Sequence, residues 1–277
     1  MIKLGCFSNL PDPDNEGGFM DLETFVPLVH DLGLDVIDFH LGKGFRSKDS
    51  DYLHNIRSLC LRHGLPVGYV GSVGNFVGSE EVVQKRMDQA RFDVGVAVAL
   101  GAPLVRLFGA SLPTDVPDRQ TIWDQMIRNF QILADEAFEH GILLGLQNHN
   151  NGNLAATGQD VVAILDEVDR PNFTCVLDTG EWEGSIGASP LGESDPDTDI
   201  YSFIEQVAPH AASVRAKIYR VETGTESWVD YKRVIGILKT AGFNGNISIV
   251  LQNQSDTCNN IEALRLATSH LRGLLKE

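Results

Sequence analysis

Residues 120–147 read QTIWDQMIRNFQILADEAFEHGILLGLQ, and this stretch contains the unit from which the rest of the chain is built. Apolar residues recur at helical spacing over residues 120–140, which predicts an amphipathic helix. Gly141 then ends the pattern, because glycine adopts without strain the left-handed backbone conformation that closes a helix. The short apolar run Leu143–Gln147 follows, as expected for a strand buried on both faces. We therefore predict a helix, a glycine stop and a strand.

The same alternation recurs along the whole chain. Helical patterns cover residues 22–32, 52–63, 80–100, 120–140, 158 onward, 199–207, 231–241 and 261–275. Apolar runs typical of buried parallel strands cover residues 2–7, 36–39, 66–70, 104–108, 143–147, 173–177, 213–217 and 247–251. Eight strands that each precede a helix predict a (β/α)8 TIM barrel, an α/β fold in a single domain over residues 1–277. A doubly wound open sheet is the alternative, but no G-x-G-x-x-G motif follows the first strand.

Length and charge narrow the range of functions. The 277 residues suit one α/β barrel. Acidic side chains outnumber basic ones by 38 to 22, so the formal charge is −16, and such a surface disfavours nucleic acids and anionic membranes as partners. The four cysteines lie far apart without a CxxC pair, and no apolar signal segment is visible at the start. We therefore predict reduced thiols in a cytoplasmic protein.

Polar residues at the carboxyl ends of barrel strands are the place to look for chemistry, since barrel enzymes build their sites there. Most of the predicted strands end in such residues. We predict one cavity that contains Gln147, His149, Asp178, Arg215, Lys217 and Gln252. Asp178 follows a buried apolar run, so its carboxylate needs a cation or several hydrogen-bond donors, which indicates a functional or site-organising role. Asp38 either joins this site or caps the loop after its strand.

Two long connections leave the same ends of the strands. Residues 8–20 follow the first strand and residues 183–198 follow the sixth, and both are rich in Gly, Pro, Asp and Asn. Loops of this length and position are either lids that close over a ligand or plain surface loops.

Four segments carry a likeness to a known family. They are LGLQNH (144–149), VLDTG (176–180), VRAK (214–217) and GFNGNISI (242–249). On these segments the chain resembles the sugar phosphate isomerase/epimerase superfamily, the xylose isomerase-like TIM barrels, over nearly its whole length. The resemblance implies an isomerase or epimerase that transfers a proton at a carbon next to a carbonyl group of a sugar. It also implies one divalent ion, Mn2+ or Mg2+, held by a Glu, an Asp, a His and a Glu from strands 5 to 8.

Those ligand positions fall on Gln147, Asp178, Arg215 and Gln252, and only Asp178 keeps an ionic ligand. For the last position Gln252 is preferred over Val250. A glutamine oxygen can bind a hard cation weakly, but it cannot abstract a proton. Arg215 places a positive charge where the fourth ligand would be, and it could instead pair with Asp178 in place of the metal. The residues therefore argue against the usual metal site and its two-glutamate mechanism.

Two classes of function remain. In the first, the protein is an isomerase, epimerase or related lyase that acts on a small sugar or polyol-like molecule. Its general base would be Lys217, His149 or Glu181. The substrate would be bound by His40, Arg106, Asn148, Trp182 and Arg215. Arg215 would favour the neutral, basic form of Lys217, although Lys217 could equally face solvent or neutralise Asp178.

The second class is a non-catalytic relative that binds a sugar-like ligand or serves as a partner subunit. Loss of both glutamates is what relaxed catalysis would produce, whereas the intact polar strand ends indicate a retained pocket. A DNA-repair endonuclease of the same superfamily is disfavoured, because the sequence offers neither a cluster of zinc ligands nor a basic face. The sequence leaves open whether the protein is a monomer or a homo-oligomer.

Overall fold

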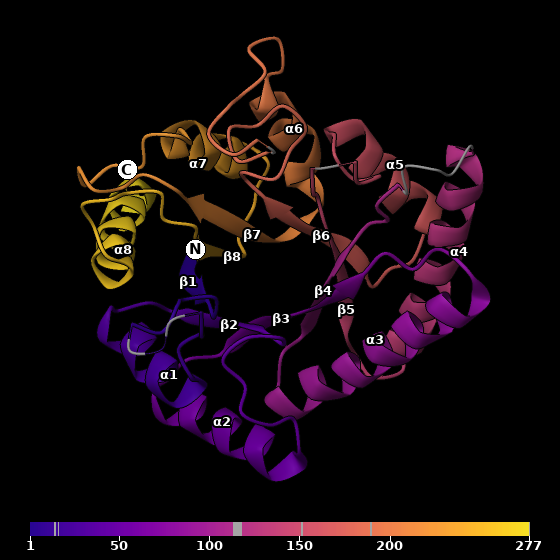
Figure 1. Ribbon diagram of the computed structural model, residues 1–277, viewed down its shortest axis with the longest axis horizontal. Coiled ribbons are helices and arrows are strands. Elements are labelled where there is room, and N and C mark those ends of the chain that lie inside the picture. The colour runs from indigo at the N-terminus through magenta and orange to yellow at the C-terminus, as the bar shows by residue number, and fades with distance from the viewer. Residues whose placement is uncertain (14, 16, 113–117, 151, 189, 277) are drawn as a thin grey trace.

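Eight parallel strands close into a barrel, and the helices form a ring around it (Figure 1). The computed structural model describes residues 1–13, 15, 17–112, 118–150, 152–188 and 190–276. Strands that follow one another in the sequence pair with each other, and β1 pairs with β8 to close the sheet. The predicted (β/α)8 TIM barrel is confirmed.

Strands and helices alternate as the sequence pattern predicts. The strands are β1 (Lys3–Phe7), β2 (Val36–His40), β3 (Val67–Gly74), β4 (Leu104–Phe108), β5 (Leu143–Gln147), β6 (Phe173–Asp178), β7 (Ala211–Ile218) and β8 (Asn246–Leu251). The helices are α1 (Leu22–Asp31), α2 (Ser50–Arg62), α3 (Glu80–Leu100), α4 (Arg119–Phe138), α5 (Gly158–Val168), α6 (Ile200–Val207), α7 (Tyr231–Thr240) and α8 (Asn260–Lys276), with a 3-10 turn at Ala208–His210. Within the described ranges, no helix is long and apolar enough to cross a bilayer.

Local sequence signals account for most element boundaries. The Thr157 hydroxyl caps α5 by accepting the backbone N–H of Asp160 at 3.1 Å. Gly101 closes α3 with a φ of 76°, in the left-handed region that favours glycine. Strand β3 runs over Val67–Gly74 and is longer than the predicted 66–70. Its second half contains Gly71 and Gly74, which interrupt the apolar pattern that marks the other strands.

Side chains fill the interior of the barrel, so the strands enclose a packed core and no open pore. The inner cluster consists of Phe7, Tyr69, Leu104, Val176 and Val250. The larger core lies outside it and includes residues of both the strands and the surrounding helices. At the carboxyl ends of the strands, the register aligns Asp178 of β6 with Arg215 of β7. The pairing of the strands therefore brings opposite charges together at one end of the barrel.

Asp38 lies fully buried within β2 and does not cap the loop that follows. Its carboxylate accepts the backbone N–H of Tyr69 at 2.7 Å. Burial raises the pKa of Asp38 to about 7, although Ser248, the Tyr69 backbone and Arg215 act in the opposite direction. Burial, together with the charge of Asp38, also raises the pKa values of Cys6 and Tyr69. A carboxyl group with this pKa is partly protonated near neutral pH.

We predict that Asp38→Asn raises the melting temperature (Tm) more at pH 8 than at pH 5. In the folded protein Asp38 keeps its proton up to about pH 7, whereas an aspartate in an unfolded chain loses its proton near pH 4. Between these values the folded state binds the extra proton, so the stability contributed by this group falls as the pH rises. Asparagine has no such titration. Calorimetric Tm values for both proteins at the two pH values provide the measurement.

Asp135→Asn is the matched control, because Asp135 is an exposed carboxylate paired with Arg170 on the surface. We expect that control to show no gain in Tm at pH 8. If Asp38→Asn lowers the Tm at pH 8, the buried carboxylate stabilises the fold when ionised and the account of Asp38 is wrong.

Candidate functional site

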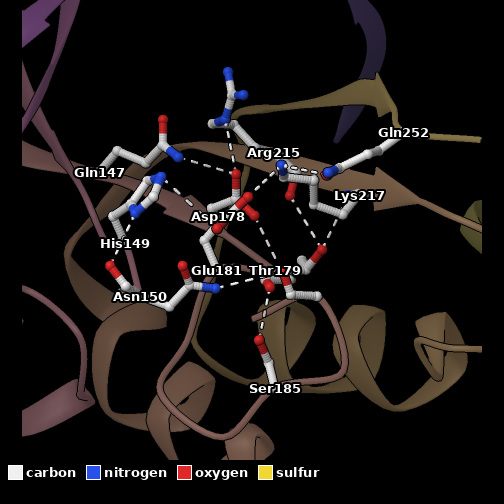
Figure 2. Close-up of polar contacts among 12 residues, drawn as sticks. Gln147, His149, Asn150, Asp178, Thr179, Glu181, Ser185, Arg215, Lys217 and Gln252 are labelled. Carbon is white, nitrogen blue, oxygen red and sulfur yellow. Dashed lines mark hydrogen bonds and ion pairs between the residues drawn. The ribbon is translucent and has the colours of Figure 1, made fainter. Parts of the chain in front are cut away.

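A buried ion pair forms the floor of the barrel mouth. Arg215 donates from Nε to the Asp178 carboxylate at 2.9 Å, and the two side chains are 6% and 0% exposed. Two further donors reach Asp178, namely the Gln147 side-chain amide at 3.1 Å and the backbone N–H of Gly180 at 3.0 Å. Figure 2 shows the amide and the guanidinium approaching the carboxylate from different sides. The charge of Asp178 is therefore compensated within the protein.

The Arg215 guanidinium is held by contacts on several sides. It donates to the Tyr69 hydroxyl at 2.6 Å, and its central carbon lies 4.4 Å from the centroid of the Phe7 ring. Burial alone would lower the pKa of Arg215, but the contacts with Tyr69 and Asp178 outweigh it and raise the pKa above its ordinary value. Arg215 is thus a permanent cation in the mouth.

The donor set of this floor does not fit a divalent cation. A carboxylate only accepts hydrogen bonds, so Gln147 must turn its NH2 group toward Asp178. Oδ2 of Asp178, which a cation would need, already accepts a hydrogen bond from the Arg215 guanidinium. The Gln252 side-chain oxygen accepts from Lys217 Nζ at 3.0 Å. Across the described part of the chain, no three His, Cys, Asp or Glu side chains are grouped to hold a metal.

Lys217, Glu181 and Gln252 form a second network beside the floor. Lys217 Nζ lies 2.5 Å from Glu181 Oε1 and 3.0 Å from Gln252 Oε1. The role of Lys217 as a general base stays a prediction, and in the structure its Nζ has two acceptors. The ion-pair partner of Lys217 is Glu181. Lys217 is buried, so it does not face solvent, and it does not neutralise Asp178. The geometry makes Lys217 a hydrogen-bond donor.

His149 faces the other oxygen of Glu181, with Nε2 at 3.8 Å from Oε2. Its Nδ1 lies 3.0 Å from the backbone oxygen of Asn150. A carbonyl oxygen only accepts, so Nδ1 carries a proton, and in the neutral form of the ring the lone pair is on Nε2. The ring packs edge-on against Phe108, and 31% of the side chain is exposed. His149 can therefore accept a proton from a bound molecule at the mouth.

His40 has the opposite arrangement of its ring nitrogens. The backbone N–H of Gly42 donates to Nδ1 at 3.0 Å, so the neutral ring carries its proton on Nε2. Burial, together with the charges of Arg106, Lys43 and Arg215, lowers the pKa of His40 to about 3. The ring is half-buried and neutral, and it presents an N–H donor.

Two residues that we expected to bind the substrate support the loops. Asn148 is fully buried, and its amide donates to the backbone oxygens of Asp178 and Glu181 at 2.9 and 3.0 Å. Its side-chain oxygen accepts the N–H of Asp178 at 2.7 Å. Trp182 is also fully buried and packs against Phe203, so its ring offers no open face for stacking on a sugar. Both side chains contact the protein itself, and their role in substrate binding stays a prediction.

The six side chains predicted to share a cavity lie in these neighbouring networks at the ends of β5 to β8 (Figure 2). Sequence reasoning missed Tyr69 and Phe7, which belong to apolar strand runs and carry no signal that they contact a charged group. The closure of residues 8–20 and 183–198 over a ligand stays a prediction. Asp14, Glu16 and Ser189 within these loops lie outside the described residues.

Comparison with known proteins gives one family and many similar structures. Residues 26–274 match the family described as the xylose isomerase-like TIM barrel. A D-tagatose 3-epimerase-like protein has a TM-score of 0.76 at 18% identity, covering 99% of this chain and 97% of the other. D-psicose 3-epimerase from Clostridium cellulolyticum H10 has a TM-score of 0.73 at 14% identity, with coverages of 96% and 90%. For the 3-keto-D-glucoside 4-epimerase of E. coli the TM-score is 0.72 at 12% identity, and both chains are covered completely. No curated protein sequence matches the chain.

We predict that three changes together, Gln147→Glu, Arg215→His and Gln252→Glu, create a tight Mn2+ site. They add two hard anionic ligands and remove the cation that occupies Asp178. Isothermal titration should show saturable Mn2+ binding to the triple variant, at least about a hundredfold tighter than to the native protein. A rise in Tm with added Mn2+ gives a second reading of the same event.

The double variant that keeps Arg215 is the control. We expect it to bind Mn2+ more weakly than the triple variant, because the guanidinium still competes for Asp178. Stoichiometric, tight Mn2+ binding to the native protein would show that the amides suffice as ligands and that Arg215 moves aside.

Proposed function

Because the chain belongs to the xylose isomerase-like TIM barrel family, we propose that it is a sugar isomerase whose side chains perform the proton transfer at the barrel mouth. The substrate is a small sugar or polyol-like molecule, and the proton moves at a carbon next to a carbonyl group. Similar structures include sugar 3-epimerases and a 4-epimerase, which supports this substrate class. The observation that carries the proposal is the bare Nε2 of His149 beside the Glu181–Lys217 ion pair.

In this mechanism His149 is the general base. Its Nδ1 proton is held by the Asn150 carbonyl oxygen, so Nε2 is free to remove the proton from carbon. The Glu181 carboxylate lies near Nε2 and stabilises the imidazolium that forms. Lys217 and the Nε2–H of His40 are the donors for the oxygen on which negative charge develops, a role that elsewhere is worth roughly 3–4 kcal/mol per donor. The proposal thus assigns the acid–base work to nitrogen groups and leaves Asp178 as a structural anion.

The placement of the base favours isomerisation over inversion at one carbon. His149 follows β5, Glu181 follows β6 and Lys217 lies in β7, and these three strands are neighbours in the barrel. A single base on one side returns the proton to the same face, at the original carbon or at its neighbour. Return to the neighbour interconverts an aldose and a ketose. Inversion at one carbon needs a second base on the opposite face, and His40 with its pKa of about 3 is a poor one.

A non-catalytic sugar-binding protein is the second candidate. The Asp178–Arg215 pair favours it, because the family's one surviving carboxylate ligand is used to neutralise an arginine. The two candidates differ in one observable. A binder takes up a sugar without exchanging any carbon-bound hydrogen.

We predict that the protein exchanges the hydrogen next to the carbonyl group with solvent when EDTA is present. Incubation in D2O with a panel of aldoses, ketoses and their acidic derivatives should reduce one C–H signal in the proton NMR spectrum. His149→Gln should slow this exchange about 10^2- to 10^4-fold, because general-base catalysis contributes that much. Deuterium at both C1 and C2 of the sugar pair would identify an isomerase.

His140→Gln is the matched control, since His140 is exposed and precedes β5, at the opposite end of that strand from Gln147, and should leave the exchange rate unchanged. If His149→Gln keeps the native rate, His149 is not the base. If sugars bind but no member of the panel exchanges, the non-catalytic candidate replaces the isomerase.

A further inference from the structure

Four basic side chains gather at the barrel mouth of a chain whose formal charge is −16. They are Lys43, Arg106, Arg215 and Lys217, each of which lowers the pKa of His40 or of Lys43 through its charge. Two of them have carboxylate partners within ion-pair distance, as Arg215 pairs with Asp178 and Lys217 pairs with Glu181. A cluster of basic side chains on an acidic protein points to an anionic ligand.

Arg106 is the most deeply buried of these cations, and it has no ion pair with a described carboxylate. It is 2% exposed, and among the described residues no carboxylate lies within 4.0 Å of its nitrogens. Its Nη1 donates to the Ser72 backbone oxygen at 3.3 Å, and its Nε has no partner. The charges of Asp178 and Asp93 reach it only over longer range. Burial and the charge of Arg215 lower the pKa of Arg106 to about 9.

The surroundings of Arg106 hold the guanidinium at the mouth. Its central carbon lies 4.1 Å from the centroid of the Phe108 ring, which in turn packs against His149. Gly71 of β3 makes room for it, because a Cβ at that position would collide with Nη2 and would touch the Phe7 ring. The guanidinium therefore sits between the floor at Phe7 and the general base.

A buried charge without a counter-charge costs stability, so its presence indicates that some function requires it. Several other arginines are exposed and paired with a carboxylate; Arg265 with Glu262 is an example. Arg106 is buried, and among the described residues it is paired with no carboxylate. Its planar guanidinium also matches the geometry of carboxylate and phosphate groups, which it can bind with two parallel hydrogen bonds.

We propose that Arg106 anchors an anionic oxygen group, a carboxylate or a phosphate, on the sugar-like ligand of the barrel mouth. The inference rests on the proposed function only for the location of the ligand. It narrows the substrate class to sugar acids or sugar phosphates. Binding of the anion supplies the negative charge that Arg106 lacks among the described residues of the protein.

The test compares D-glucuronate, D-glucose 6-phosphate and uncharged D-glucose by thermal shift and by isothermal titration at low salt. We expect at least one of the two anions to bind at least about tenfold more tightly than D-glucose, and the arm that binds identifies a carboxylate or a phosphate. Arg106→Met should weaken that anion at least about tenfold, because charge-assisted hydrogen bonds are lost. The ligand-free variant should have a Tm equal to or above the native value, since it loses an uncompensated buried charge.

Arg265→Met is the matched control, because it removes the same charge from an exposed surface position and should leave anion affinity unchanged. Three outcomes would overturn the proposal: no stabilisation by either anion, equal affinity for D-glucose, or a lower ligand-free Tm for Arg106→Met with unchanged anion affinity. These are binding measurements, so they stand apart from the hydrogen-exchange assay. If the native protein exchanges hydrogen but binds neither anion, this inference alone is rejected. If the native protein binds an anion but exchanges no hydrogen, only the isomerase is rejected.

Discussion

The ion pair between Asp178 and Arg215 is the interaction on which the rest of the mouth depends. Both side chains are almost completely buried, so neither charge would be tolerated without the other. The register of β6 and β7 places them opposite each other, and Gln147 and Tyr69 complete the hydrogen bonds of the pair. In this family position a divalent ion would normally neutralise the aspartate. Here the Arg215 guanidinium neutralises Asp178, so the floor of the mouth is held in place by an ion pair within the protein.

Under the proposed function, this pairing moves the chemistry away from Asp178 and Arg215. Once Asp178 is neutralised by Arg215, the groups left to act on a ligand are the nitrogen atoms above it. His149 offers a lone pair, whereas His40 and Lys217 offer N–H donors. Arg106 adds a charge that has no partner in the described part of the chain. The mouth therefore combines one acceptor with several donors, as suits a ligand that carries or develops negative charge.

The fold could be predicted from the sequence because each helix, glycine stop and apolar strand is a local signal. The second half of β3 was missed, since its glycines interrupt the apolar run although they leave space for Arg106. At the site, the pairing of Arg215 with Asp178 was foreseen as one of two possibilities. The roles of Asn148 and Trp182 were not, because an amide or an indole after a strand is as typical of loop support as of ligand binding. Only tertiary contacts separate the two.

A crystal structure determined from protein crystallised with excess Mn2+, with anomalous data collected at the manganese edge, tests the central claim most directly. That claim is that Arg215 replaces the metal as the partner of Asp178. The account predicts no anomalous peak among Gln147, Asp178 and Gln252, with the guanidinium still on the carboxylate. A strong peak bonded to Asp178, with Arg215 turned away, would contradict it.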